Sequence, residues 1–332
     1  MAVWAKQEKT LSFIEAQDLK KYYRSKSSEI KALDGLSLSI PQGTVKGLLG
    51  PNGAGKTTAV KILTTLTIPT SGEAFIDGVS VLDEPERIRR MIGVSGQYAA
   101  VDQKLTGFEN LEMIGRLYHL SASAAKRRAN ELIELFDLVD AANRPVKGFS
   151  GGMRRRIDLA GALIVNPAVL FLDEPTTGLD PKSRLDLWNV IKDLVSGGTT
   201  VLLTTQYLEE ADRLADSIAV IDHGRVIAEG TSDELKLQIG GQYIELSLVS
   251  LDDVEQGKSL LQSLASEKVF IGNDGRTLSV AVDSAPEKLQ TALKLFSDAS
   301  IELNDAGMRR PTLDDVFLSL TGSQAQEDEV SK

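Results

Sequence analysis

The 332-residue sequence predicts an α/β fold with a mostly parallel sheet at its core and a small α+β domain towards its C-terminus. Apolar, β-branched runs recur at residues 44–50, 168–173, 200–205 and 217–222, and amphipathic helical stretches separate them. This alternation is typical of buried parallel strands joined by helices. After Gly230 the pattern changes to alternating strands and two helices, which indicates a second domain.

The first apolar run leads into GPNGAGKTT at 50–58, which fits the phosphate-binding pattern G-x-x-x-x-G-K-[ST]. Its glycines let backbone amides turn towards a polyphosphate, Lys56 reaches the phosphates, and the Thr57 hydroxyl can bind Mg²⁺. The helix predicted at 57–66 directs its positive N-terminus at the same anion. The nucleotide-binding residues predicted in this loop are Gly50, Asn52, Gly53, Gly55, Lys56, Thr57 and Thr58.

Between about residues 97 and 166 the pattern becomes helical, with stretches at 108–120, 125–136 and 153–165. Ser121 is the predicted N-cap of the second stretch. We expect a helical subdomain inserted into the α/β core.

A carboxylate pair follows the apolar run at 168–173. Asp173 and Glu174 stand at the carboxyl end of that strand, where open α/β sheets bind ligands. Alone, such a pair fits an ordinary solvated turn. Together with the phosphate loop, it predicts that Asp173 holds Mg²⁺ and that Glu174 takes a proton from the attacking water.

A second anion-binding helix N-terminus is predicted at FSGGMRRR, residues 149–156. Two such N-termini can hold one nucleotide from opposite sides if the second belongs to another protomer. The three arginines Arg154, Arg155 and Arg156 are interpreted as a solvated helix face rather than as a nucleic-acid contact.

The C-terminal region has an alternating run at 243–249, a hairpin turning at Asp274-Gly275, and helices at 287–296 and 313–320. The polar stretch 323–332 is interpreted as a disordered tail.

Composition excludes several functions. The chain has no cysteine and only two histidines, so disulfides, thiolate catalysis and His/Cys metal clusters are excluded. A net charge of −10 argues against nucleic acid as a partner. The sequence shows neither a long apolar span nor a signal peptide, so we expect a cytosolic chain.

The order phosphate loop, SGG, LDEP, GLD resembles an ATP-binding cassette (ABC) ATPase over about residues 11–235. The resemblance implies a P-loop cassette at 1–235 with an antiparallel β part, followed by an α+β domain at 236–322. It also implies residue roles. Tyr23 or the adjacent Tyr22 would stack on adenine, and Gln97 would contact Mg²⁺ and relay motion to a membrane partner. Ser150, Gly151 and Gly152 would cap the γ-phosphate across a dimer, and Asp180 would connect the two active sites.

Gln206 departs from the family pattern, which usually has a histidine at this position. An amide can position the γ-phosphate by hydrogen bonds but cannot change charge near neutral pH. Either Glu174 is the principal base with Gln206 as positioner, the alternative we favour, or turnover is slow.

The stretches at 95–102, 150–156, 202–216, 220–231 and 313–322 are similar to those of ATP-binding subunits of daunorubicin/doxorubicin-resistance exporters. That resemblance implies an ATPase that binds ATP and Mg²⁺, forms a homodimer on ATP, and works at the cytoplasmic face of the membrane with a separate ABC-2 type permease. Its substrate would be drug-like or lipid-like. A non-transport ABC ATPase and an importer subunit are the alternatives; one cassette, a short insertion and a pI near 4.9 argue against the first.

Overall fold

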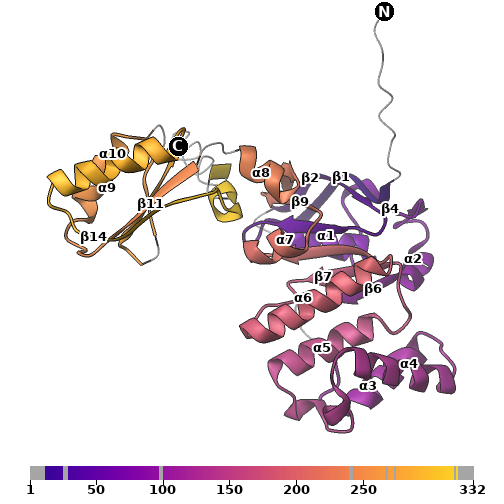
Figure 1. Cartoon of the computed structure of the whole chain (residues 1–332). Coiled ribbons are helices and arrows are strands. Elements are labelled where there is room, and N and C mark those ends of the chain that lie inside the picture. The colour runs from indigo at the N-terminus through magenta and orange to yellow at the C-terminus, as the bar shows by residue number, and fades with distance from the viewer. Residues whose placement is uncertain are drawn as a thin grey trace, which may run out of the picture. The chain divides into compact units, whose positions relative to one another are not determined.

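A computed structural model describes residues 12–24, 29–96, 100–238, 242–265, 268–272, 274–317 and 319–320. The chain divides into two compact units, Met1–Ser232 and Asp233–Lys332 (Figure 1). The α/β class predicted from the sequence is confirmed. The polar stretch 323–332, for which a disordered tail was predicted, lies outside the described residues.

A six-stranded sheet forms the centre of the first unit, in the order β10-β9-β3-β8-β7-β6. Its pairings are parallel except that β10 runs antiparallel to β9. The strands are β3 (Val45–Leu49), β6 (Ile92–Ser95), β7 (Val169–Asp173), β8 (Thr200–Thr205), β9 (Ser217–Asp222) and β10 (Arg225–Gly230). Every residue of β3, β7 and β8 is buried, as expected for a sheet covered on both faces.

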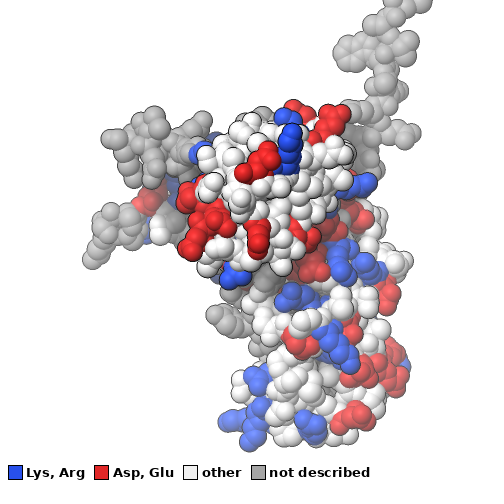
Figure 2. Space-filling view, turned by 60° about the vertical axis from the view of Figure 1, so that its left-hand side comes forward, with Lys and Arg blue, Asp and Glu red and all other residues white. Residues whose placement is uncertain are grey.

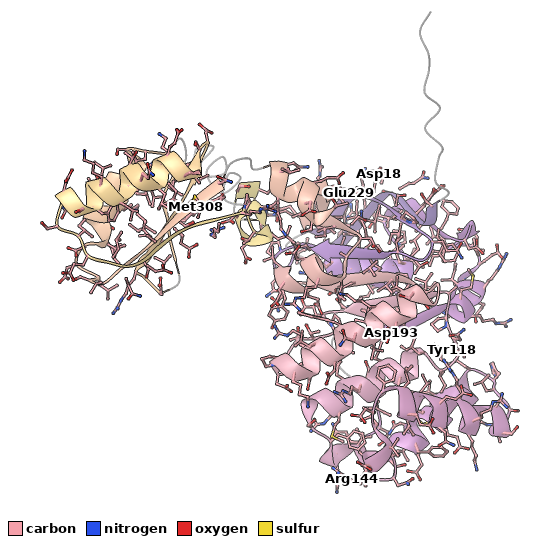
Figure 3. The ribbon with its side chains drawn as sticks, in the orientation of Figure 1. Asp18, Tyr118, Arg144, Asp193, Glu229 and Met308 are labelled. Carbon is pink, nitrogen blue, oxygen red and sulfur yellow. The ribbon has the colours of Figure 1, made fainter. Side chains whose placement is uncertain are left out.

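A second, antiparallel sheet contributes to the core on one side of the first unit. It has the order β2-β1-β4-β5, with β1 (Ser12–Arg24), β2 (Glu29–Pro41), β4 (Ser71–Ile76) and β5 (Val79–Ser80). Its buried side chains share one apolar cluster with α1 (Lys56–Leu63) and with residues of β7, β8 and β9. Figure 3 shows Asp18 of β1 and Arg144 of the helical part at opposite ends of this unit.

Helices form the other side of the first unit, and their apolar faces share a second cluster with the central sheet. They are α3 (Gly107–Leu117), α4 (Ala122–Leu135), α5 (Gly151–Ala162), α6 (Pro181–Ser196) and α7 (Leu208–Leu214), with short 3-10 turns η1 (Val139–Ala141) and η2 (Val146–Gly148). The short helix α2 (Pro85–Met91) instead contributes Ile88 to the cluster shared with the antiparallel sheet. The predicted N-cap Ser121 is confirmed, since its hydroxyl accepts a hydrogen bond from the Ala124 amide.

The second unit is a small α+β structure. Its antiparallel sheet has the order β12-β13-β11-β14, and α9 and α10 pack against each other and against this sheet. The elements are α8 (Ser232–Gln238), β11 (Gln242–Leu248), α9 (Val254–Gln262), β12 (Phe270–Ile271), β13 (Thr277–Val282), α10 (Ala285–Asp298) and β14 (Leu303–Arg309). The predicted turn is confirmed: the Asp274 carboxylate accepts hydrogen bonds from the Arg276 and Thr277 amides, and Gly275 has φ 70°. α9 and β14 were not predicted from the sequence.

Among the residues that the structure describes, no helix combines the length and apolar composition needed to cross a bilayer.

Candidate functional site

Three neighbouring strands end side by side at one edge of the central sheet. In the parallel register Leu49 of β3 lies opposite Thr205 of β8, and Asp173 of β7 lies opposite Thr204. The segments that follow these strands carry the phosphate loop, Gln206 and Glu174 respectively. The sheet therefore brings together the residues predicted to bind and hydrolyse a nucleotide.

The phosphate loop needs glycine at two positions because the backbone approaches other strands closely. A Cβ on Gly50 would lie 2.3 Å from the carbonyl oxygen of Ile221. Gly55 has φ 108°, and a Cβ there would lie 2.4 Å from the carbonyl oxygen of Ala32. Any side chain at these positions would displace the loop, so the glycines fix the shape of the cradle.

The N-terminus of α1 is open to an anion. Its N-cap Gly55 provides no side-chain hydrogen bond, and the first turn contains no acidic residue. The first amides of the helix are thus left for a ligand, and the helix dipole favours a negative one. This arrangement fits the phosphates of a nucleotide.

Lys56 lies in the loop with only 5% of its surface exposed. Its Nζ donates hydrogen bonds to the carbonyl oxygens of Gly50 at 2.7 Å and Pro51 at 3.0 Å. Burial lowers the pKa of Lys56, whereas the carboxylates of Glu174 and Asp173 raise it. Two carbonyl groups at the start of the loop therefore hold the ammonium, and two carboxylates lie near it.

The Asp173 carboxylate is the meeting point of the three segments. Its Oδ1 accepts hydrogen bonds from Thr57 Oγ1 at 3.3 Å and from Thr204 Oγ1. Carboxylate and hydroxyl oxygens suit Mg²⁺, so the donor set of Thr57 and Asp173 fits this cation.

Glu174 has a left-handed backbone, with φ 50°, which is uncommon for a residue with a side chain. Its amide donates to the carbonyl of Thr204 at 3.0 Å and to the Thr204 hydroxyl at 3.1 Å. The Thr177 hydroxyl donates to Glu174 Oε2 at 3.3 Å. The surrounding contacts thus fix the direction of a half-buried carboxylate.

Gln206 is half-buried between β8 and α7. The residues after it are attached to α6: the Arg184 guanidinium lies 5.0 Å from the Tyr207 ring centroid, and Trp188 Nε1 donates to Glu210 Oε1 at 3.1 Å. Glu210 is fully buried, and this burial raises its pKa. The Gln206 segment is therefore held against α6.

The SGG residues and Asp180 form a second group. Ser150 caps α5 by accepting from the Met153 amide, and Asp180 caps α6 by accepting from the Ser183 amide at 3.0 Å. A Cβ on Gly152 would lie 2.9 Å from Ser183 Oγ, so the two helix N-termini lie against each other. Gly151 begins α5. Gln97, predicted to contact Mg²⁺, lies outside the described residues.

The two candidate tyrosines differ in their surroundings. The Tyr22 hydroxyl donates to Asp34 Oδ1; this bond, with another from Arg225, lowers the pKa of Asp34 to about 2. Tyr23 is 44% exposed. Its ring is the more accessible of the two, and its stacking on adenine stays a prediction.

The interpretation of the three arginines as a solvated face is wrong for Arg155. This residue is 7% exposed, and its guanidinium donates to the carbonyl oxygens of Gly96, Asp173 and Pro175. The signal that could have revealed it is the oppositely charged Asp158 three residues later, on the buried side of α5.

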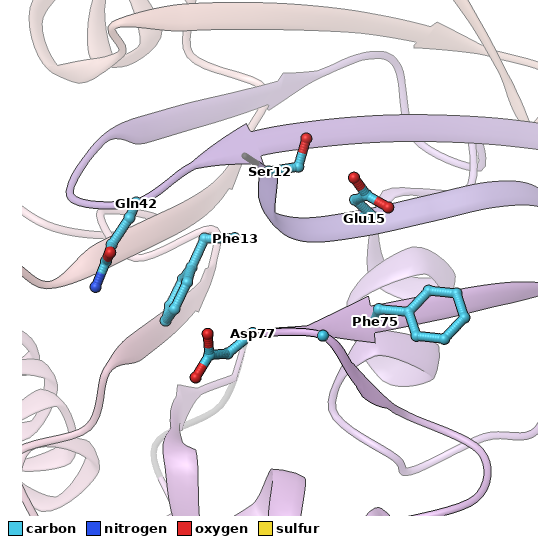
Figure 4. A pocket seen from close by; sticks show the side chains of 7 residues that line it. Ser12, Phe13, Glu15, Gln42, Phe75 and Asp77 are labelled. Carbon is cyan, nitrogen blue, oxygen red and sulfur yellow. The ribbon is translucent and has the colours of Figure 1, made fainter. Parts of the chain in front are cut away.

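A separate hollow of about 620 Å³ lies on the antiparallel sheet (Figure 4). Its lining includes Ser12, Phe13, Gln42, Phe75 and Asp77, and it contains none of the predicted phosphate-binding or carboxylate residues. It is not the nucleotide site.

Comparison with known proteins supports the same chemistry. The family described as ABC transporter matches residues 33–177. A daunorubicin resistance ATP-binding protein of Streptomyces coeruleorubidus is 52% identical over 91% of this chain and 94% of its own length. A Nod factor export ATP-binding protein I of Ralstonia nicotianae is 39% identical over 92% of this chain and 93% of its own length. A dimeric ATP-binding cassette in a post-hydrolysis state with ADP and Pi has 30% identity and a TM-score of 0.62, covering 66% of this chain and 98% of that one.

Lys56→Ala removes the cation of the cradle, and we expect it to weaken ATP binding about 10- to 100-fold, since a charge-assisted hydrogen bond is lost in the bound state. Isothermal titration calorimetry with ATP measures the change. Lys61→Ala, on the exposed side of the same helix, is the control. Unchanged affinity in Lys56→Ala would contradict the assignment of the cradle.

Proposed function

Because this chain belongs to the ABC transporter family, among the daunorubicin/doxorubicin resistance ATP-binding proteins, we propose that it drives export of a drug-like or lipid-like substrate through a separate ABC-2 type membrane permease. The chain is an ATPase and the ATP-binding subunit of a drug-resistance exporter-type transporter. The observation that carries the proposal is that Lys56, Asp173 and Glu174 lie at the same edge of the sheet. They do so in a chain that is 52% identical to a daunorubicin resistance ATP-binding protein.

The proposed chemistry divides between binding and proton transfer. The α1 amides and Lys56 hold the phosphates, and Thr57 and Asp173 would hold Mg²⁺, which neutralises phosphate charge when bound. Glu174 accepts the proton of the attacking water. Its fixed backbone and the bond from Thr177 support this role, because a general base must be held within hydrogen-bond reach of the water.

We propose that the active form is a homodimer on ATP. The group of Ser150, Gly151, Gly152 and Asp180 then meets the nucleotide of the partner protomer. The matching post-hydrolysis cassette is itself dimeric, which supports this arrangement.

The proposed location is the cytoplasmic face of the membrane, bound to the permease. On the face in Figure 2, the described Lys and Arg side chains lie among Asp and Glu side chains rather than forming one continuous basic surface. This distribution supports a protein partner over nucleic acid. Co-purification from detergent-solubilised membranes tests the proposal: an ABC-2 type protein supports it, and an importer permease or a ribosomal particle contradicts it.

Glu174→Gln is expected to keep ATP affinity and to lower hydrolysis by about 10² to 10⁴, the usual contribution of a general base. Because the bound ATP is not hydrolysed, it should hold the protein as a dimer. Phosphate release and size exclusion with Mg-ATP measure the two effects, and Lys56→Ala, which should stay monomeric, is the control. A Glu174→Gln variant that hydrolyses at the wild-type rate removes Glu174 from the mechanism.

Gln206→His should add an inflection between about pH 6 and 7 to the hydrolysis rate, because imidazole titrates near pH 6.5 and an amide does not. The profiles are compared at saturating Mg-ATP so that changes in binding do not enter. Superimposable profiles, together with a wild-type rate for Gln206→Ala, would show that residue 206 does not act on the γ-phosphate.

A further inference from the structure

Arg155 holds the backbone on both sides of Glu174. Its Nε donates to the carbonyl oxygen of Pro175 at 2.7 Å, and its Nη2 donates to that of Asp173 at 3.2 Å. Glu174 and Pro175 lie along the chain between these two carbonyls. Since Glu174 has φ 50°, its backbone adopts a conformation that the surroundings must enforce, and the guanidinium bonds the peptide group before Glu174 and the one after Pro175.

The same side chain is linked to a third segment through Asp158, one turn along α5. Asp158 Oδ2 lies 3.5 Å from Arg155 Nη1 and accepts from Ser95 Oγ at 2.6 Å. Asp158 Oδ1 accepts from the Ala100 amide at 2.7 Å, and Arg155 Nη1 donates to the carbonyl oxygen of Gly96. The pair therefore joins the end of β6 to the end of β7.

Fold stability alone does not require these charges at this position. A buried ion pair stabilises a protein little more than a well-packed apolar pair, because both ions lose their hydration. What the pair provides is direction: three N–H groups of one planar fork reach three carbonyl oxygens, a geometry that an ammonium group does not reproduce.

We propose that Arg155 is a positioning residue for hydrolysis, which fixes the backbone around Glu174, and that Asp158 holds the Arg155 guanidinium in the required orientation. The inference rests on the proposed role of Glu174 as the base. Arg155 itself touches neither nucleotide nor water in this scheme; it acts through the direction of the Glu174 carboxylate.

Arg155→Lys in the full chain tests the proposal, because it keeps the charge and loses the fork. We expect kcat to fall about tenfold or more, while ATP affinity stays within about threefold and the thermal midpoint stays close to wild type. Arg156→Lys is the matched control, since Arg156 is the next residue of the helix and pairs with Asp186 instead. Asp158→Asn, of equal size, is the second variant, with an expected fall in kcat of about threefold or more.

Combination with Glu174→Gln separates positioning from a general loss of structure. If Arg155 acts through Glu174, Arg155→Lys should cause less than about a twofold further loss of the residual single-turnover rate in the Glu174→Gln background. If the losses of Arg155→Lys and Glu174→Gln multiply in the double variant, the inference is overturned. It is also overturned if both Arg155→Lys and Asp158→Asn keep the wild-type kcat, or if these variants lose as much ATP affinity as kcat. If Glu174→Gln alone hydrolyses like wild type, the base assignment fails and the inference with it; if only the Arg155 and Asp158 variants hydrolyse like wild type, the inference fails alone.

Discussion

The parallel adjacency of β3, β8 and β7 is the constraint on which the site depends. Loops that follow parallel neighbours leave the sheet at the same edge, so residues far apart in the chain meet there without long connections. The shared carboxylate of Asp173 shows how close this meeting is, because hydroxyls from α1 and from β8 both reach it. The phosphate loop leaves the sheet at this edge close to the backbone of Ile221 and of Ala32, which explains the close approaches at Gly50 and Gly55.

Buried charge is concentrated around this edge, and its placement follows from desolvation. Lys56, Arg155 and Glu210 are each almost inaccessible to solvent. Burial lowers the pKa of Lys56 and of Arg155 and raises the pKa of Glu210, because it disfavours the charged form of each group. Each group is compensated locally: the two cations by backbone carbonyls, the carboxylate by an indole N–H. Such groups hold their neighbours in one geometry, because any other arrangement would leave a buried charge without a partner.

Local patterns predicted the parts of the site that follow from local structure. The phosphate loop, the carboxylates after an apolar strand and the N-cap Ser121 depend on short stretches of sequence, and such stretches also located the buried strands β3, β7, β8 and β9. The antiparallel strand β1 was not predicted from local patterns, and register shifts and the positive φ of Asp18 interrupt its alternation. Local sequence offers only Asp158 as a sign that Arg155 is buried, since the carbonyl groups that Arg155 bonds come from segments 18 to 59 residues away.

Within each protomer of the proposed dimer, helix α6 contacts both the SGG segment and the segment that follows Gln206. Asp180 begins this helix, and Ser183 in its first turn lies against Gly152, so the SGG segment and the helix share one boundary. Arg184, the next residue, contacts Tyr207, and Trp188, about one turn after Arg184, contacts Glu210; both partners follow Gln206. In the dimer, a displacement of the SGG segment by the partner's nucleotide would therefore reach the Gln206 segment of the same protomer through a single rigid element. Side chains packed on one helix transmit such a displacement because a close-packed interface has few alternative arrangements. The glycine at 152 permits this close contact, because a Cβ there would lie 2.9 Å from Ser183 Oγ and 3.3 Å from Ser183 Cβ.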